Sequence, residues 1–480
     1  MLVAGVDSST QSTKVVLCRA EDGAVIGSGS APHPDGTECD PQAWWDALLI
    51  AGRGLLDRAD AVGVAAQQHG MVALDDAGAV VRPALLWNDM RSARQAVDLI
   101  AELGGPGEWA RRTGSVPTAS FTVTKLRWLA EREPANAART SMVVLPHDWL
   151  TWRLGSAPAF SPVPGDWPRT RPVTDRGDAS GTGYFSPADG TWLPGLAKAA
   201  LGRDIDLPEV AGPAGAVGQT SWGAVLSAGT GDNMGAALGL GLRDGDVVIS
   251  IGTSGTAFAV TPAGAADPSG AVAGFADATG RFLPLVCTMN AARVLTITAG
   301  LLGVDPDTMS GLALAAQPGA GGLSLLPYLD GERTPNRPDA AGVLSGLTTA
   351  NFTRQNVARA AVEAVLCGLA DAVDHLIAAG LTPRRVLLIG GGARSAAIRA
   401  IAPGVFGTEV AVPEPAQYVA IGAARQAAWA LAGTSEPPPW PERAATSYQG
   451  VPVPQVRERY AALRDATATW QGPRQEGSAP

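Results

Sequence analysis

Cysteine is scarce in this chain, and its placement excludes two common kinds of small stabilised fold. Only 4 cysteines occur in 480 residues. They lie far apart, form no C-x-x-C pair and have no paired histidines nearby, so the sequence predicts neither a zinc site nor a disulfide framework. Unpaired thiols are typical of a reducing compartment, and we therefore expect the protein in the cytoplasm.

Positive charge is also in short supply. Lysine and arginine number 36 against 45 aspartates and glutamates, which gives a formal net charge of -9. A protein with this negative net charge attracts neither a phosphate backbone nor an acidic lipid surface, so we expect no nucleic-acid or membrane partner. No apolar run reaches the roughly 20 residues of a membrane-spanning helix. The short apolar run at residues 1–6 meets Asp7 without a basic leader, and we expect no signal peptide.

Small and apolar residues are what the chain has in quantity. Hydrophobic residues make up 46% of it, charged residues only 17%, and 59 residues are glycine. This composition is typical of an ordered protein with many buried small side chains. The length exceeds what one hydrophobic core normally supports, so two large domains are expected.

Hydrophobic patterning predicts a strand, a hydroxyl-rich turn and a second strand over residues 2–18. A similar strand, glycine-hydroxyl turn and strand occurs over residues 247–260. Two related hairpins in two halves indicate a duplicated architecture with a cleft between the copies. The alternative is that both are ordinary glycine turns.

Other elements follow from periodicity and from glycine and proline punctuation. Helices are expected over residues 41–56, 92–102, 122–131, 150–154, 353–379, 396–401 and 420–431, the last being alanine-rich enough for close packing. Strands are expected at 61–66, 83–87, 386–389 and 410–412. Residues 104–114 are expected to form a loop, 156–176 an irregular surface excursion, and 471–480 a frayed end.

The stretch S-A-G-T-G-D-N-M-G-A-A-L-G, residues 227–239, places one carboxylate in unusual surroundings. Glycines on both sides of Asp232 let the backbone approach a ligand closely, and Asn233 is the only large polar neighbour. Asp232 is thus a candidate general base. Aspartate is also a common helix N-cap, and this stretch alone leaves both interpretations open.

Three turns rich in glycine and hydroxyls are candidate phosphate sites, because exposed N–H groups and short O–H donors can surround an anion. They span residues 7–14, 252–256 and 390–395. None fits the P-loop pattern or the G-x-G-x-x-G fingerprint, and each alone is as well explained as a plain turn. Together with Asp7, which can hold a hydrated magnesium ion, they favour a bound nucleotide.

Six motifs occur in one order: V-D-S-S-T-Q-S-T-K, W-N-D-M-R-S, T-D-R-G-D-A-S-G-T-G, G-T-G-D-N-M-G-A-A-L-G, P-Y-L-D-G-E-R-T-P and I-G-G-G-A-R-S. On these blocks the chain, from residue 3 to about 429, resembles the FGGY family of carbohydrate kinases. The resemblance implies an α/β fold of two actin-like, ribonuclease-H-like domains with a central cleft. It implies a sugar-binding and catalytic domain over 1–241, a nucleotide-binding domain over 242–440 and an extension over 441–480.

The resemblance also implies an activity. The γ-phosphate of ATP, held with Mg²⁺, would pass to the terminal hydroxyl of a ketopentose, with D-xylulose expected and ribulose or another ketose or polyol as the alternative. An actin-like or Hsp70-like ATPase switch is the rival from another class. A non-catalytic sugar sensor is disfavoured because Asp7 and Asp232 are both present. A homodimer is the default assembly.

Site residues carried over from the family match particular positions here. Asp232 resembles the catalytic base, and a carboxylate of ordinary or lowered pKa would serve in phosphoryl transfer. Asp7 resembles the residue that positions magnesium and phosphates. The remaining assignments are Thr10, Ser12 and Lys14 for the first phosphate loop, Gly252, Thr253 and Ser254 for the second, Gly391, Gly392, Ala393 and Ser395 for adenosine, and Gln68, His69, Trp87 and Asn88 for the sugar.

Some positions depart from the pattern or lie outside the catalytic set. Gln68 stands where relatives often have methionine, which adds a polar group to the expected sugar pocket, and Gln417 stands where they often have glutamate. Glu332 and Arg333 are expected to form an ion pair or loop brace. The other histidines, His33, His147 and His375, show no pattern of partners and are expected to be structural.

Overall fold

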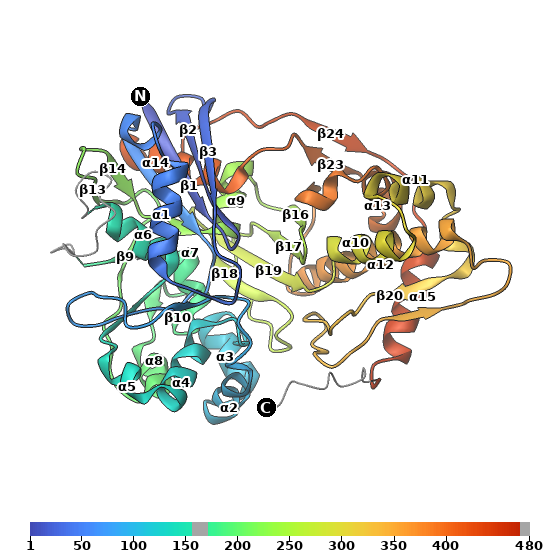
Figure 1. Cartoon of the computed structure of the whole chain (residues 1–480), viewed down its shortest axis with the longest axis horizontal. Coiled ribbons are helices and arrows are strands. Elements are labelled where there is room, and N and C mark those ends of the chain that lie inside the picture. Colours follow the sequence, from blue (N-terminus) through green and yellow to red (C-terminus); the bar gives the residue numbers. More distant parts are fainter. Residues whose placement is uncertain (156–170, 471–480) are drawn as a thin grey trace. The chain divides into compact units, whose positions relative to one another are not determined.

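The computed structural model describes residues 1–155 and 171–470 (Figure 1). Most of the expected surface excursion and the whole of the expected frayed end lie outside these residues. The chain forms two compact units, each built from several segments. The first unit comprises Met1–Arg243, Val260–Pro284 and Ala416–Glu442, and the second comprises Asp244–Ala259, Leu285–Pro415 and Arg443–Pro480.

The first unit is organised around a sheet whose centre is β1. In order across the sheet its strands are β13 (Ala216–Gln219), β14 (Val225–Ser227), β5 (Ala61–Ala66), β1 (Leu2–Ser8), β2 (Ser12–Arg19) and β3 (Val25–Pro32). β1 to β3 form an antiparallel meander, whereas β1, β5 and β14 run parallel. The short β15 (Thr230–Gly231) also runs parallel to β5. The predicted hairpin at residues 2–18 is confirmed.

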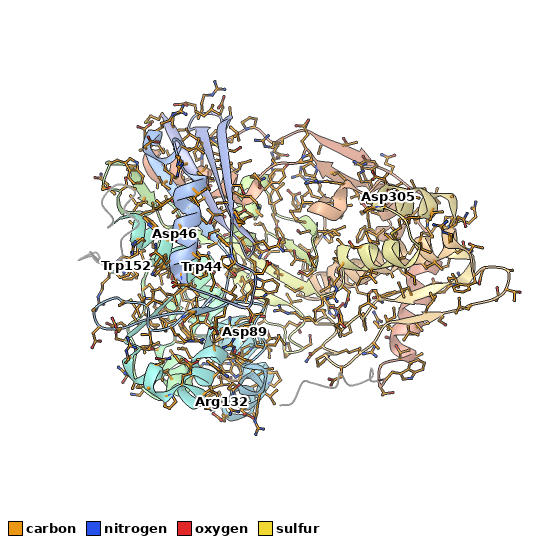
Figure 2. All side chains as sticks on the ribbon, viewed as in Figure 1. Trp44, Asp46, Asp89, Arg132, Trp152 and Asp305 are labelled. Atoms are coloured by element: carbon orange, nitrogen blue, oxygen red, sulfur yellow. The ribbon has the colours of Figure 1, made fainter. Side chains whose placement is uncertain are left out.

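The two faces of this sheet are covered by helices from opposite ends of the chain. Alternate residues point to opposite faces of a strand, and Ala4 and Val6 pack with Trp44 of α1 (Pro41–Ala51), which is labelled in Figure 2. Val3 packs on the other side with α14 (Tyr418–Ala432). Two apolar layers therefore hold β1 between them.

Glycine brings α14 into close contact with the sheet. A Cβ on Gly5 would lie 1.8 Å from the carbonyl oxygen of Ala420, so no larger residue fits at this position. The same holds where α14 meets α9 (Asp232–Leu240), because a Cβ on Gly422 would lie 1.8 Å from the oxygen of Gly235. The close packing predicted for the alanine-rich helix is confirmed.

The second unit repeats the strand order of the first. Its sheet contains, in order, β19 (Phe282–Thr288), β17 (Gly255–Ala259), β16 (Asp246–Ile251), β22 (Arg385–Ile389), β23 (Val410–Pro413) and β24 (Ala445–Tyr448), and β18 (Ala273–Ala276) pairs with the outer side of β19. Directions match as well: β16, β22 and β23 run parallel, and the strands beyond them at either side are antiparallel. This correspondence confirms the duplicated architecture.

The longest helix, α12 (Arg354–Ala378), belongs to the second unit. Thr353 caps its N-terminus by accepting a hydrogen bond from the N–H of Asn356. Its apolar residues are largely buried, as the periodicity predicted. No helix in the described part of the chain combines the length and apolar character needed to cross a membrane.

Other elements are shorter. The helices are α2 (Ala93–Glu102), α3 (Gly105–Thr113), α4 (Thr122–Arg132), α5 (Pro134–Arg139), α6 (Pro146–Leu154), α7 (Arg176–Ala179), α8 (Pro194–Leu201), α10 (Ala292–Leu301), α11 (Pro306–Ala315), α13 (Ala396–Phe406) and α15 (Pro454–Ala466). The strands are β4 (Glu38–Cys39), β6 (Val72–Leu74), β7 (Ala84–Leu85), β8 (Met142–Val144), β9 (Val173–Asp175), β10 (Phe185–Ser186), β11 (Thr191–Trp192), β12 (Glu209–Ala211), β18 (Ala273–Ala276), β20 (Ser324–Leu326) and β21 (Val343–Ser345).

Two of these elements correct the sequence-based expectation. Residues 104–114 form helix α3 instead of a loop, because Pro106 stands in its first turn, Gly114 ends it in the left-handed conformation, and Trp109 is buried. Glycine and proline here mark the helix ends. Residues 173–175, predicted to be irregular, form strand β9, which pairs with β12.

Candidate active site

Asp7, Gln68 and Asp232 come from three parallel strands that end at one edge of the first sheet. Asp7 is aligned with Ala65 of β5, and Gly231 of β15 is aligned with Ala66. Gln68 follows β5 by two residues, and Asp232 directly follows β15. The carboxyl ends of parallel strands are where α/β proteins bind ligands. The sheet thus brings together residues that are more than 200 positions apart in sequence.

Asp232 is the first residue of α9, and Gly231 occupies the N-cap position. The simple cap interpretation is therefore wrong, although its Oδ1 does accept hydrogen bonds from the Asn233 backbone N–H at 2.8 Å and from Asn233 Nδ2 at 2.9 Å. Burial, and then repulsion from Asp7 and Asp178, raise the pKa of Asp232 to about 7. This corrects the expectation of an ordinary or lowered pKa, because loss of solvation outweighs the helix N-terminus.

Asp7 is almost completely buried and has two neighbours from its own hairpin. Ser9 Oγ donates to Oδ1, and Lys14 Nζ lies 3.3 Å from Oδ2. Hard carboxylate oxygens are the ligands that Mg²⁺ prefers. A second carboxylate, Asp232, is close enough for the charge of Asp7 to raise its pKa, and a cation would relieve that repulsion. The residues present therefore fit a magnesium ion.

Gln68 connects the end of β5 to Asp232 through one intermediate. Its Oε1 accepts a hydrogen bond from Asn233 Nδ2 at 3.1 Å, and the same amide group also donates to Asp232. Its own Nε2 is buried and has no hydrogen-bond partner among residues 1–155 and 171–470. Because a buried unpartnered N–H group is costly, Gln68 presents a donor that a ligand oxygen would satisfy.

His69 is held in a fixed orientation beside Gln68. Its Nδ1 lies 2.6 Å from the carbonyl oxygen of Gly181, so Nδ1 is a donor nitrogen, and Nε2 is the acceptor in the tautomer that has its single proton on Nδ1. The imidazole packs against Phe121 and Phe275, with ring centroids 4.7 and 5.7 Å away. An acceptor nitrogen in this position suits a substrate hydroxyl.

Trp87 and Asn88, predicted as weaker sugar contacts, follow β7. Trp87 is partly exposed and is not a core residue, and its Nε1–H donates to Thr10 Oγ1 at 2.7 Å. This bond joins the predicted sugar site to the first phosphate loop. Asn88 Nδ2 donates to the carbonyl of Gly36 at 3.4 Å. Ser12, at the start of β2, is partly exposed.

The two loops predicted to hold the nucleotide lie together in the second unit. Residues 252–254 form the tip of the β16–β17 hairpin, where Thr253 is exposed. The turn at 390–395 follows β22, the parallel neighbour of β16. A Cβ on Gly390 would lie 2.7 Å from the oxygen of Ile251, and one on Gly392 would lie 2.3 Å from its side chain. Glycine is needed there so that both turns reach one edge of the sheet.

The residues of the second turn differ in what they present. Gly391 is exposed, with open space where a side chain would be, whereas Gly392 and Ala393 are buried. Ser395 is the N-cap of α13 and accepts from the N–H of Ile398. Gly391 thus leaves backbone accessible to a ligand, and the other three hold the turn in shape.

His147 lies in a buried cluster that sequence reasoning missed. Its Nδ1 lies 2.6 Å from Asp178 Oδ2, and its Nε2 lies 3.1 Å from Asp148 Oδ1 and 3.9 Å from Asp175 Oδ1. Although burial opposes the charged form, these carboxylates raise the pKa of His147 to about 9. The expectation of no partners was wrong, because Asp148 is the next residue in the chain and Asp175 and Asp178 come from a separate segment. A Cβ on Gly229 would lie 2.4 Å from this ring, so the loop before Asp232 rests on it.

Glu332 braces a loop in the second unit. Its carboxylate accepts hydrogen bonds from the backbone N–H groups of Met289 and Arg333 and from Asn290 Nδ2. The expected brace is confirmed. Gln417 is an exposed N-cap of α14 that makes no side-chain cap bond.

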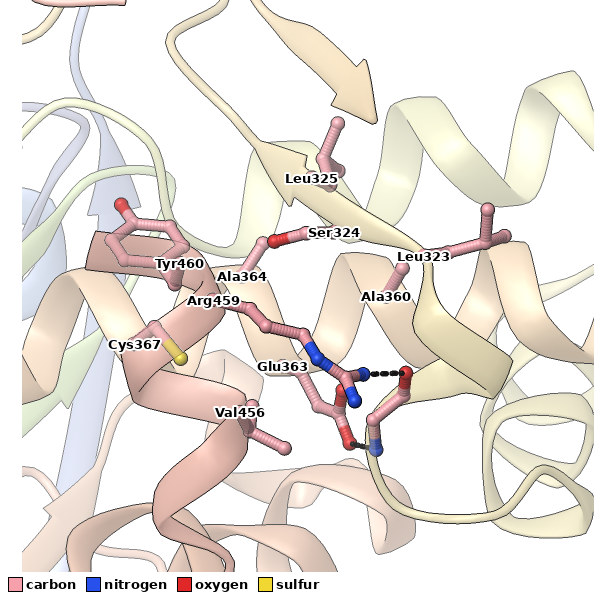
Figure 3. Close-up of a pocket in the computed structure, with 11 residues that line it drawn as sticks. Leu323, Ser324, Leu325, Ala360, Glu363, Ala364, Cys367, Val456, Arg459 and Tyr460 are labelled. Carbon is pink, nitrogen blue, oxygen red and sulfur yellow. Dashed lines mark hydrogen bonds between the residues drawn. The ribbon is translucent and has the colours of Figure 1, made fainter. Parts of the chain in front are cut away.

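A small groove in the second unit contains none of the predicted site residues (Figure 3). It lies where α15 meets α12. Glu363 of α12 accepts from the N–H of Gly319, and Arg459 of α15 donates to the carbonyl of Gly319 at 3.4 Å. Arg359 also pairs with Glu363 at 2.6 Å. These contacts satisfy the polar groups of a helix joint.

Comparison with known proteins agrees with this geometry. The N-terminal domain model of the FGGY family of carbohydrate kinases matches residues 2–241, and the C-terminal domain model matches residues 247–431. The chain is 47% identical over 449 residues to the xylulose kinase of Streptomyces coelicolor, covering 90% of this chain and 88% of that protein. It is 46% identical over 448 residues to the xylulose kinase of Streptomyces rubiginosus, with the same coverage.

Solved structures show the same fold. The xylulose kinase of Bifidobacterium adolescentis matches with a TM-score of 0.88 and 45% identity over 97% of this chain and 99% of that chain. The glycerol kinase of Plasmodium falciparum, at 17% identity, shares the fold alone, with a TM-score of 0.83. The expected two-domain α/β sugar-kinase fold is confirmed, and the chain belongs to the FGGY family of carbohydrate kinases.

Proposed function

We propose that this enzyme uses ATP to phosphorylate D-xylulose, giving D-xylulose 5-phosphate. The observation that carries the proposal is the similarity of nearly the whole chain to xylulose kinases at 46–47% identity. The first unit supports it independently, since Asp232 there has a pKa near neutrality beside a buried, unpartnered donor of Gln68.

In this proposal the sugar is held by polar groups at the edge of the first sheet. Gln68 Nε2 donates to one sugar oxygen, and His69 Nε2 accepts from a hydroxyl. Trp87 and Asn88 bound the same site, and Asn233 fixes the carboxylate of Asp232 relative to Gln68. A polyhydroxyl substrate requires such paired donors and acceptors.

Asp232 would then accept the proton of the attacking hydroxyl. A base is most effective when its pKa lies near the working pH, and the raised pKa of Asp232 meets that condition. Asn233 keeps one carboxylate oxygen engaged, which orients the other toward the substrate. The γ-phosphate of ATP is the electrophile, and displacement in line leaves ADP.

Asp7 and the first hairpin would hold the phosphate end of ATP. Asp7 binds Mg²⁺ through water, and Thr10, Ser12 and Lys14 contact phosphate oxygens. Gly252, Thr253 and Ser254 are assigned to a second phosphate loop, and Gly391, Gly392, Ala393 and Ser395 to the adenosine site. When bound, the ion neutralises phosphate charge during transfer. On this assignment residues 1–241 bind the sugar and the phosphates and supply the base, residues 242–440 bind the nucleotide, and 441–480 form an extension.

Two alternatives have specific support and specific tests. Gln68, in place of the methionine common among relatives, adds a donor to the sugar site, which favours a ketose or polyol with a different hydroxyl pattern, such as ribulose. The actin-like fold also occurs in ATPase switches. A kinase shows ADP release that depends on sugar, whereas a switch hydrolyses ATP without it.

The deciding experiment is a coupled ADP-release assay over a panel of ketoses and polyols. We expect D-xylulose to give the highest kcat/KM. Asp232→Asn should lower kcat by about 10²- to 10⁴-fold, the range attributed to a positioned base. Asp57→Asn, which removes an exposed carboxylate of the first unit, is the matched control and should leave kcat unchanged. Near-normal turnover in Asp232→Asn would refute the mechanism, and preference for another sugar would refute the substrate.

We further propose that the enzyme works in the cytoplasm, where ATP is regenerated, and that it forms a homodimer. Light scattering coupled to size-exclusion chromatography measures its mass directly. A mass of one chain, near 48.8 kDa, would refute the dimer.

A further inference from the structure

His69 has a backbone conformation that its residue type rarely adopts. Its φ is 66°, in the left-handed region, where any side chain with a Cβ is strained. Such a conformation persists only when surrounding contacts enforce it, and strained residues of this kind cluster at ligand sites. The contacts on the backbone of His69 therefore explain how its ring is placed.

Two donors from one helix converge on the carbonyl oxygen of His69. Lys125 Nζ donates to it at 2.9 Å, and Thr122 Oγ1 donates at 3.2 Å. Both residues lie in the first turns of α4 and are completely buried. The carbonyl of the strained residue is thus held from α4 by a cationic and a neutral donor.

Lys125 is an unexpected residue in this position. A buried ammonium group is costly, and an apolar side chain of similar length would fill the space without that cost. Its Nζ donates to two backbone carbonyls, those of His69 and, at 2.6 Å, of Ser120. Burial lowers the pKa of Lys125 to about 7, and attraction to Asp89 only partly opposes this. A costly group retained on the backbone of a site residue indicates a positioning role.

The start of α4 also fixes the imidazole ring of His69. Phe121, the N-cap residue of α4, packs against the imidazole, whose Nδ1 donates to the carbonyl of Gly181. A Cβ on Gly181 would lie 2.8 Å from that nitrogen, so the ring has little room to turn. Backbone and ring are therefore both set by neighbours, and the strain at φ is maintained.

We propose that Lys125 and Thr122 form a clamp on the His69 carbonyl that positions the imidazole for the sugar and so determines sugar affinity. The inference rests on the proposed function, in which His69 binds the sugar. Lys125 and Thr122 are positioning residues, since they act through His69. Loosening the clamp alters sugar binding and leaves nucleotide binding intact, because the nucleotide loops belong to other elements.

Kinetics of three variants test the clamp. Lys125→Met removes the stronger donor at similar length, and we expect the KM for D-xylulose to rise about tenfold. Thr122→Val removes only the longer bond with little change of shape, and a rise of about threefold is expected. Thr140→Val is the matched control: its hydroxyl is equally buried and also donates to a backbone carbonyl, that of Asn136. The KM for ATP should stay within about twofold throughout.

Several outcomes would overturn the clamp. Unchanged sugar KM in Lys125→Met and Thr122→Val would do so, as would equal rises in the KM for sugar and ATP, or a rise in Thr140→Val as large as in Thr122→Val. If Lys125→Met does not fold, Thr122→Val decides alone. If the wild type does not phosphorylate D-xylulose, the proposed function fails, and the clamp is judged from the His69 imidazole signals in ¹H–¹³C NMR spectra. Those signals should shift from their wild-type positions in Thr122→Val and not in Thr140→Val. Wild-type positions in both variants would refute the clamp.

Discussion

At the scale of single residues, Asp232 shows a conflict between activity and stability. Its pKa is raised from an ordinary 3.8 to about 7. Between these two pH values the unfolded chain has lost a proton that the folded chain retains, so stability falls as pH rises. Above about pH 7 the carboxyl group is ionised in both the folded and the unfolded chain, and the loss of stability is complete. Placing a base with a near-neutral pKa therefore destabilises the fold at working pH.

Replacing this carboxyl should reverse the loss. Asp232→Asn cannot ionise, so we expect its Tm to exceed that of the wild type by several °C at pH 8 and to equal it within error near pH 4, each pKa unit corresponding to about 1.4 kcal/mol. Thermal denaturation from pH 4 to 8 measures the difference. Asp57→Asn should show no such trend. A difference independent of pH would mean that the pKa of Asp232 is not raised.

The charge of His147 contributes stability with a different pH dependence. Its pKa is raised from 6.5 to about 9 by Asp148 and Asp178, against the effect of burial. The stabilisation from its charge is present in full below pH 6.5 and disappears as pH rises through 9. Breaking a buried ion pair on one side leaves uncompensated charge, so we expect His147→Leu to cost about 3 to 5 kcal/mol at pH 6.

The pH dependence of that cost separates charge from packing. Urea denaturation at pH 6 and at pH 9.5 gives the free energy of unfolding of wild type and variant. The cost of His147→Leu should be clearly smaller at pH 9.5, where the wild-type ring is neutral as well. An equal cost at both pH values would show that His147 contributes only shape.

At the scale of elements, the contact of α9 with α14 holds Asp232 in place. The two helices approach at Gly235 and Gly422, and a Cβ on Gly422 would lie 1.8 Å from the oxygen of Gly235. The atom in the way is a backbone oxygen, which cannot move aside as the end of a flexible side chain could. One added methyl group at this position must therefore separate the two helices. Because Asp232 is the first residue of α9, the position of its carboxylate depends on this packing.

We therefore expect Gly422→Ala to destabilise the protein by about 1 to 3 kcal/mol or more and to lower kcat. Gly300→Ala is its matched control, since Gly300 lies in α10 with open space around its Cα. The usual helix preference for alanine makes Gly300→Ala neutral or slightly stabilising, by up to about 1 kcal/mol. Chemical denaturation and steady-state kinetics on both variants check this. Similar stabilities would contradict the close contact.

The sequence predicted well those elements whose signal is local. Helix α12 and strand β5 followed from periodicity, and Thr353 was the expected boundary of α12. Helix α3 was missed because its glycines and proline read as a loop, and α15 because proline accumulates before it. The buried contacts that stabilise these helices, through Trp109 and Tyr460, depend on distant segments and carry no local pattern.

The candidate site divides in the same way. Gln68, His69 and Asp232 were predicted because they lie within short motifs at strand ends. Lys125 and His147 were not, because Lys125 contacts a backbone carbonyl 56 positions away and His147 Nδ1 pairs with Asp178, 31 positions away, and no motif encodes either contact. The raised pKa of Asp232 could not be predicted either, because it depends on burial and on Asp7.

At the scale of the whole molecule, the two corresponding sheets carry different side chains at equivalent turns. In each unit a hairpin and the parallel strand beside it end in turns at one edge. In the first unit these turns carry Asp7, Gln68 and the hydroxyls of residues 8–13, whereas in the second they carry glycine and hydroxyls. On the proposed assignment, the turns of the first unit contact sugar and phosphate, and those of the second contact the nucleotide.

Hydrogen exchange in the presence of one ligand at a time tests which loops bind the sugar and which bind the nucleotide. D-Xylulose alone should slow amide exchange about tenfold or more at residues 67–70 and at the start of α9, because bound ligand lowers the population of locally open states. A non-hydrolysable ATP analogue alone should slow exchange at 252–254 and 390–395. Each ligand leaves the loops assigned to the other unchanged, and Asp57→Asn should reproduce both patterns. Protection of 67–70 by the nucleotide alone, or of 390–395 by the sugar alone, would contradict the assignment of residues 67–70 to the sugar and of residues 390–395 to the nucleotide.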